Sequence, residues 1–240
     1  MLNGENYDVI ARQKLPVILV VDTSSSMRGK RIARVNSAIA DIKDYLSRLN
    51  SETSEVDFYV SVLAFGTGSE FFEWGNNTHI SEFVPVPITA GGYSNLHLAY
   101  EKLGEILKKE SSGGQMPDFG GVAPIIMLIT DGHPSKSTKS ELNKLKKLPW
   151  FNASVRYGIA IELDDDKTMA TLTDFTDDSS SVINCVNSDN LAKLIKIIVL
   201  TASKVKSQSS SLGNKKSQEV KIAVKQLIQS SLDGFEDLEW

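Results

Sequence analysis

The chain alternates between two patterns of apolar and polar positions. Short β-branched apolar runs, such as residues 15–21 and 124–129, are typical of strands buried in a parallel sheet. Apolar residues three or four positions apart, as in residues 32–49, predict a helix with one buried face. The predicted strands are 15–21, 56–65, 124–129, 155–162 and 182–186, with a short antiparallel edge strand at 71–74. The predicted helices are 32–49, 96–110, 139–148, 167–175 and 190–204.

This alternation of strands and helices predicts an α/β fold: a doubly wound, mostly parallel sheet with one antiparallel edge strand and helices on both faces. The domain is expected to span residues 12–204, after an N-terminal extension at 1–11. A polar loop is expected at 75–95. Residues 205–240 read as a flexible linker and an acidic tail with a possible short helix, either disordered or docked on a partner.

Composition narrows the classes of function. The hydrophobic fraction of 41% and charged fraction of 23% are those of an ordinary globular protein, and 240 residues suffice for one sizeable core. The formal net charge of -4 argues against wholesale binding of nucleic acid. We expect no nucleic-acid partner.

The terminal segments and the single cysteine bear on location. Residues 1–8 are polar and acidic, unlike a signal peptide, and the apolar stretch 191–202 is interrupted by two lysines and is too short to cross a bilayer. Cys185 lies in an apolar run and is expected to be a buried structural thiol. We therefore expect a soluble, cytoplasmic protein without a membrane partner.

Two buried strands are followed at once by oxygen-bearing side chains. Asp22, Ser24 and Ser26 follow the strand at 15–21, and Asp131 follows the strand at 124–129. Because ligands of doubly wound sheets bind at the carboxyl ends of the strands, these groups are expected to share one site. Oxygen ligands suit a hard cation such as Mg²⁺. The alternative for Asp22 and the serines is a helix N-terminal cap, since such residues cap well.

The motifs resemble those of von Willebrand factor type A domains. Residues 22–26 match the Asp-x-Ser-x-Ser element that opens the metal-ion-dependent adhesion site, or MIDAS, of that family. Ser94, in the Gly-rich loop 91–96, stands where the family has Thr, and Asp131-Gly132 matches the third element. The resemblance implies a metal site formed by Asp22, Ser24, Ser26, Ser94 and Asp131.

The family resemblance implies a function as well as a site. The site would hold Mg²⁺, with Mn²⁺ or Ca²⁺ also possible, and would bind an acidic residue of another protein at the remaining coordination position. The chain would then be a non-enzymatic interaction module. Within the family it looks most like bacterial TerY-type proteins of tellurite-resistance and stress-response systems. That resemblance implies a partner in a phospho-signalling system, such as a kinase or phosphatase.

Two other classes of function stay open from the residues. Asp22 after a buried strand could serve as the nucleophile of a Mg²⁺-dependent phosphohydrolase, but Ser24 occupies the position where such enzymes need a second Asp as acid and base. A degenerate scaffold whose site never fills is the third possibility. The sequence contains no Gly-x-Gly-x-x-Gly, no P-loop and no Gly-x-Ser-x-Gly.

Charged groups near these loops give weaker signals. Basic residues after the first and third loops predict a basic rim that steers an acidic partner: Arg28, Lys30, Arg31, Arg34, Lys136 and Lys139. A solvated helix start is the alternative. His133 is interpreted as a loop residue, although it lies two positions from Asp131, and the acidic run 162–166 as a solvated loop.

Overall fold

The computed structural model describes residues 12–52, 56–66, 72–119, 121–162, 165–185, 190–207, 222–223, 226 and 238–239. One sheet of seven strands, in the order β3-β2-β1-β4-β5-β6-β7, forms the middle layer. The strands are β1 (Gln13–Asp22), β2 (Val56–Phe65), β3 (Phe72–His79), β4 (Ile125–Thr130), β5 (Val155–Ile161), β6 (Val182–Cys185) and β7 (Leu238–Glu239). The five strands from β2 to β6 in this order pair in parallel, and β3 pairs antiparallel with β2 at one edge.

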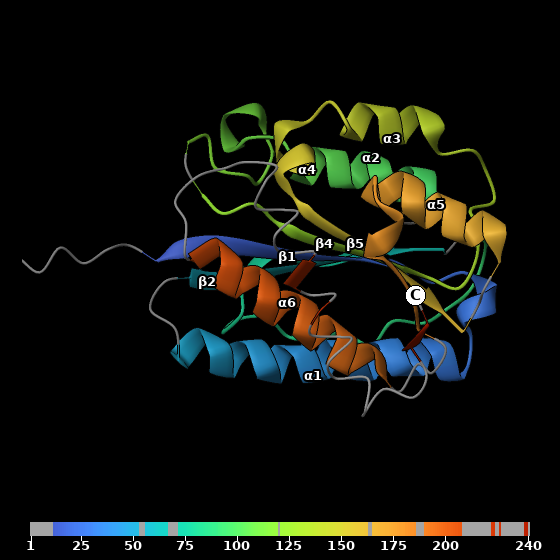
Figure 1. Cartoon of the computed structure of the whole chain (residues 1–240), viewed down its shortest axis with the longest axis horizontal. Coiled ribbons are helices and arrows are strands. Elements are labelled where there is room, and N and C mark those ends of the chain that lie inside the picture. The colour runs from blue at the N-terminus through green and yellow to red at the C-terminus, as the bar shows by residue number, and fades with distance from the viewer. Residues whose placement is uncertain are drawn as a thin grey trace, which may run out of the picture.

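Helices cover both faces of the sheet (Figure 1), which confirms the predicted doubly wound α/β fold. The helices are α1 (Lys30–Glu52), α2 (Leu96–Ile106), α3 (Lys139–Leu145), α4 (Pro149–Ala153), α5 (Asp166–Thr176) and α6 (Leu191–Ser207). Short 3-10 turns lie at η1 (Ser25–Met27), η2 (Glu110–Ser112) and η3 (Ser179–Ser181). In Figure 1, α1 and α6 lie below the sheet and α2, α3, α4 and α5 above it.

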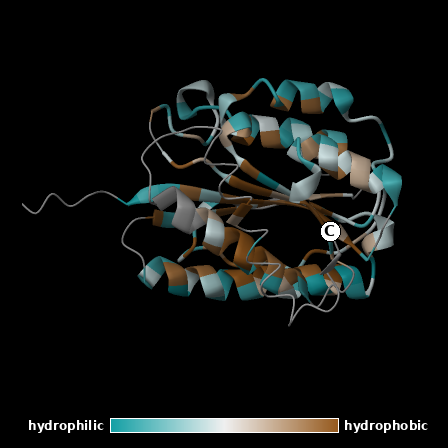
Figure 2. Cartoon of the chain, in the orientation of Figure 1, coloured by the Kyte–Doolittle hydropathy of each residue, from teal (hydrophilic) through white to brown (hydrophobic). Residues whose placement is uncertain are grey.

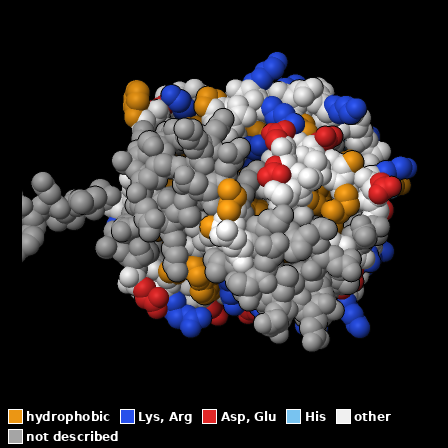
Figure 3. Space-filling model, in the orientation of Figure 1, with side chains coloured by type: hydrophobic (Ala, Val, Ile, Leu, Met, Phe, Trp, Pro, Cys, Tyr) orange, Lys and Arg blue, Asp and Glu red, His pale blue; other side chains and the backbone are white. Residues whose placement is uncertain are grey.

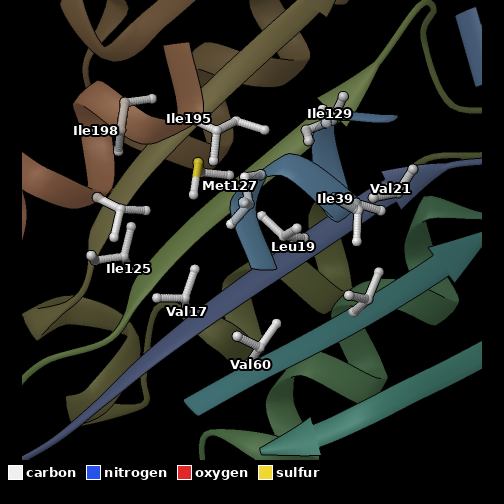
Figure 4. Packing of buried hydrophobic residues seen from close by; sticks show 14 of the residues in the cluster. Val17, Leu19, Val21, Ile39, Val60, Ile125, Met127, Ile129, Ile195 and Ile198 are labelled. Carbon is white, nitrogen blue, oxygen red and sulfur yellow. The ribbon is translucent and has the colours of Figure 1, made fainter. Parts of the chain in front are cut away.

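The sheet divides the core into two apolar layers, because successive strand residues point to opposite faces. In β1, Val17, Leu19 and Val21 pack with α1 and α6, while Ile18 and Val20 pack with the helices of the other face. Figure 2 shows the hydrophobic colour concentrated in the strands and on the inner sides of the helices, and Figure 4 shows part of the first layer. Burying each such side chain contributes about 1.5–3 kcal/mol to stability.

The structure corrects several predicted element bounds. The predicted helix 139–148 ends at Leu145, and an unpredicted α4 begins at Pro149, because the residue before a proline disfavours helical geometry: Leu148 is extended, with φ -82° and ψ 127°. The edge strand predicted at 71–74 continues as β3 to His79, into the predicted loop. The pairing of β3 with β2 shifts register between Val60 and Val62, and at this irregularity the Ser61 hydroxyl accepts a hydrogen bond from the Asn77 amide at 2.6 Å.

The predictions for the two chain ends fall mostly outside the described residues. Residues 1–11 lie outside the described residues, as do most of 205–240. Leu238 and Glu239 pair antiparallel with β6 and add a second edge strand that the sequence did not predict. Cys185 is buried, as predicted, and burial raises the pKa of its thiol to about 12. None of the helices described is long and apolar enough to cross a membrane.

Candidate metal centre

The five predicted site residues meet at the carboxyl end of the sheet, where β1 and β4 lie side by side. Asp22 ends β1, Ser24 and Ser26 lie in and beside the η1 turn, Asp131 follows β4, and Ser94 precedes α2. The chain leaves β1 toward β2 on one side and reaches β4 on the other, so this is the point where the strand order reverses. Doubly wound sheets form their ligand crevice at that point.

Backbone contacts fix the loop that follows β1. The Thr23 amide donates to the Phe65 carbonyl at 2.7 Å, and the Thr23 carbonyl accepts from the Gly91 amide at 2.7 Å. Gly66 lies against this loop with φ +152°, and a Cβ atom there would stand 2.4 Å from the Ser24 nitrogen. Only glycine combines that φ with that close approach. The position of Ser24 is therefore set by the end of β2.

Asp22 is the buried centre of the cluster, with no exposed surface. Its Oδ2 accepts hydrogen bonds from Thr130 Oγ1 at 2.7 Å and from Ser94 Oγ at 3.0 Å, and its Oδ1 accepts from the Ser24 amide at 2.8 Å. Burial raises the pKa of Asp22, and these hydrogen bonds oppose that rise because they favour the charged form. Asp22 therefore joins all three segments of the site.

The serine hydroxyls form the outer part of the cluster. Ser24 Oγ lies 3.0 Å from Ser26 Oγ, which donates to Asp131 Oδ1 at 2.7 Å. Neighbouring ligands of an octahedral Mg²⁺ stand about 2.9 Å apart, given metal–oxygen distances of about 2.05 Å. These oxygen separations fit such an ion. Ser26 is exposed, so the cluster opens to solvent on that side.

The helix-cap alternative accounts for only part of this geometry. Ser24 is the N-cap of η1 but its side chain makes no capping hydrogen bond. Asp22 does accept from the Ser24 amide and so belongs to the turn. The two serine hydroxyls instead contact each other, and the Ser26 hydroxyl also donates to Asp131.

Two residues of this cluster have roles that the sequence did not indicate. Thr130, the last residue of β4, is buried, and its hydroxyl donates to Asp22 Oδ2 and lies 2.9 Å from the Gly132 carbonyl oxygen. Arg31 Nη1 donates to Asp131 Oδ2 at 2.6 Å and to the Ser26 carbonyl at 3.3 Å, and Nε donates to Glu162 at 3.2 Å. A polar last residue in an apolar strand was a usable signal for Thr130.

Contacts within the protein hold two of the residues of the predicted basic rim. Arg31 is held by two carboxylates, and Arg28 Nε donates to the Ala90 carbonyl at 3.2 Å. The acidic run at 162–166 is in part structural: Asp165 caps α5 by accepting from the amides of Lys167 and Thr168. Among the described residues, no group of three or more His, Cys, Asp or Glu side chains could hold a metal. Any cation here would therefore depend on the hydroxyls.

Residues 17–197 match the sequence pattern of the von Willebrand factor type A domain, and the chain belongs to that family. No curated protein matches the chain.

Solved structures share the fold. The ArnB paralog VWA2 from Sulfolobus acidocaldarius is 18% identical with a TM-score of 0.53, over 78% of this chain and 45% of that chain. Proximal thread matrix protein 1 from the mussel byssus, with a zinc-occupied MIDAS motif, is 19% identical with a TM-score of 0.54, over 80% and 48%. The vWF domain of the type V pili tip protein Mfa5 from Porphyromonas gingivalis is 12% identical with a TM-score of 0.55, over 85% and 99%. This chain thus spans less than half the length of the first two.

Proposed function

We propose that the chain is a non-catalytic interaction module that binds a carboxylate of another protein through a divalent cation. The observation that carries this proposal is the cluster of three serine hydroxyls and two aspartates at the carboxyl edge of the sheet, open to solvent at Ser26. The mussel protein whose structure has a zinc-occupied MIDAS motif supports it by fold. When bound, the cation would supply a positive charge with a coordination position for an external oxygen.

The burial of each residue in the cluster indicates its role toward the cation. Ser24, Ser26 and Ser94 would offer hydroxyl oxygens, and Asp131 would offer charge from its Oδ1 side. Asp22 has both carboxylate oxygens hydrogen-bonded inside the protein. It would orient Ser24 and Ser94, and its negative charge would act on the cation without direct coordination. Beside Ser94, Tyr93 is 74% exposed, and exposed aromatic side chains are common in interfaces.

The proposal also names the ion and the biological system. All-oxygen ligands favour Mg²⁺, with Mn²⁺ or Ca²⁺ as further candidates. The amino-acid sequences of the motifs around Asp22 and Asp131 are similar to those of bacterial TerY-like proteins. This similarity supports a tellurite-resistance or stress system with a kinase or phosphatase partner. A cytoplasmic location belongs to this same proposal.

The phosphohydrolase alternative fits the site poorly. A nucleophilic carboxylate must reach the phosphorus atom, whereas Asp22 is buried and both its oxygens accept hydrogen bonds. Ser24 also offers no acid where one is needed.

Calorimetry with Mg²⁺ tests the metal site, and the loop itself provides a matched control. Ser24→Ala and Ser26→Ala should each abolish or strongly weaken binding. Ser25→Ala should not, because the Ser25 hydroxyl donates to the Gly92 carbonyl and stays outside the cluster. Equal effects of all three changes would contradict the assignment of the Ser24 and Ser26 hydroxyls as ligands, and no binding of Mg²⁺, Mn²⁺ or Ca²⁺ at millimolar concentration would favour the empty scaffold.

A pull-down with and without chelator tests the interaction. Partner capture should need metal and should be lost in Asp22→Ala and Asp131→Ala. Turnover of a generic phosphoester that vanishes in Asp22→Asn would instead support the enzyme.

A further inference from the structure

A basic cavity adjoins the candidate metal centre. It has a volume of about 340 Å³ and lies between the loop after β4 and the helix α5. Its lining includes His133, Lys136 and Lys139 from the loop and the start of α3, and Lys167 from α5. Figure 3 shows positively charged side chains over α3 and at the outer end of α5, with acidic ones among them.

Lysines outnumber carboxylates in the lining of this cavity. Among the described residues that line it, Asp174 is the one carboxylate, against three lysines. Within the part of the chain that the structure describes, none of the three ammonium groups forms an ion pair. Ser135, Ser137 and Thr138 add hydroxyl groups that can donate hydrogen bonds. The lining is therefore suited to an anionic group.

A second cavity has the opposite balance of charge. It also measures about 340 Å³ and lies between α2 and α3, where Lys108 and Lys144 are accompanied by Glu101, Glu105 and Glu141. There the carboxylates outnumber the lysines. It provides lysines of similar exposure for a matched control.

The basic cavity is joined to the metal centre by the backbone. His133 follows Asp131 by two residues, so their Cα atoms lie within about 7 Å. The Ser135 amide donates to the Ser94 carbonyl at 3.1 Å, which holds the cavity loop against the loop that carries Ser94. A peptide with one carboxylate at the metal centre needs only a few extended residues to reach the lysines.

We infer that the cavity is a second subsite, which binds another acidic side chain of the same protein segment that gives its carboxylate to the metal. This inference rests on the proposed function, because both sites would serve one partner. The partner segment would then carry two or more Asp or Glu residues a few positions apart. The lysines would contribute to affinity and to the rate of association, and both contributions would weaken as salt screens the charges.

Tetraglutamate is the probe, with tetraglutamine as the uncharged control of equal length. Amide chemical shifts of the full chain are followed by NMR in chelator at low salt, so that the cavity is tested without the metal. Tetraglutamate should shift the amides of residues 133–139 and 167–171, and tetraglutamine should not. The Lys139→Gln/Lys167→Gln double variant should weaken tetraglutamate binding about fivefold or more. The control double variant Lys108→Gln/Lys144→Gln should change it less than about twofold.

The outcomes separate this inference from the proposed function. If tetraglutamate binds the cavity but Mg²⁺ does not bind the chain, the subsite stands and the metal-dependent module fails. If Mg²⁺ binds while the cavity amides stay unmoved, or while both double variants weaken tetraglutamate equally, the subsite is overturned. Thermal melting of each variant checks that these exposed substitutions leave the fold intact.

Discussion

Arg156 and Arg31 both form ion pairs with carboxylates, and they do so in opposite ways. Arg156 in β5 is 7% exposed. It donates to the carbonyls of Phe151, Phe175 and Thr176, pairs with Asp177 at 2.7 Å and stacks on the Phe151 ring at 4.3 Å. Arg31 in α1 has a half-buried side chain and donates mainly to two carboxylates, those of Asp131 and Glu162.

The difference lies in which partner is buried. Arg156 is the buried member of its pair, and it satisfies carbonyls at the end of α5 that the helix leaves without partners. For Arg31 the buried member is the carboxylate: the Asp131 side chain has no exposed surface, and it also lies in the candidate metal centre. Arg156 therefore stabilises the fold, whereas Arg31 occupies a carboxylate that a cation would use.

Stability is the first measurement that separates the two. Arg156→Met should lower the free energy of unfolding by about 3 kcal/mol, since it leaves buried carbonyls without donors. Arg31→Met in metal-free protein should cost only about 1 kcal/mol, because Asp131 keeps its hydrogen bond from Ser26 and the loss of the partly exposed guanidinium lets water reach the Asp131 carboxylate. Urea denaturation of both variants measures this. Equal losses would contradict the distinction.

Metal affinity should respond in the opposite order. Arg31→Gln removes a positive charge from Asp131 and should raise Mg²⁺ affinity about tenfold, or about 1.4 kcal/mol. Arg34→Gln removes the same charge one helical turn later in α1 and should change affinity less than about twofold. Calorimetry gives both values. A loss of affinity in Arg31→Gln would show that Arg31 positions Asp131 for the ion.

Asp22 extends the comparison to a buried carboxylate that has only uncharged donors. Burial raises the pKa of Asp22 above the 3.8 of a free aspartate, so the folded state binds this proton more tightly than the unfolded chain does. Its contribution to stability is present below pH 3.8 and is lost as pH rises through the raised pKa. Asp22→Asn should remove this loss in metal-free protein. Denaturation at several pH values in chelator measures the difference, and parallel pH profiles for both proteins would contradict it.

Glu162 should give the smallest effect. It draws the Arg31 guanidinium toward solvent, so Glu162→Gln should strengthen the hold of Arg31 on Asp131 and lower Mg²⁺ affinity about twofold. The effect should fade at high salt, because Glu162 is exposed. Mg²⁺ titrations at low and high ionic strength test this. An unchanged affinity at both would show that Glu162 does not influence the metal centre.

The sequence predicted those features that the local pattern of apolar and polar residues determines. The buried strands and most helices were predicted from their periodicity. The helix predicted at 96–110 ends at Ile106, the helix predicted at 139–148 ends at Leu145 before the unpredicted α4, and the edge strand extends to His79. Asp22, Ser24, Ser26 and Asp131 were predicted as ligands because strand ends of a parallel sheet converge, and Ser94 was predicted from the family resemblance; the structure brings these side chains together, and their role as ligands stays a prediction. The pairing of Arg31 with Asp131 was not found, since the two are 100 positions apart and nothing local distinguishes a paired arginine from a solvated one.

The spread of the site along the chain has a consequence for folding. Asp22 and Thr130 are 108 positions apart, and their contact exists only when β1 and β4 are already paired. An ion that needs this cluster can bind only the finished central sheet. It would add stability by mass action, about 2.7 kcal/mol at a free concentration of one hundred times Kd. Ion occupancy would thus report that the two halves of the sheet have joined.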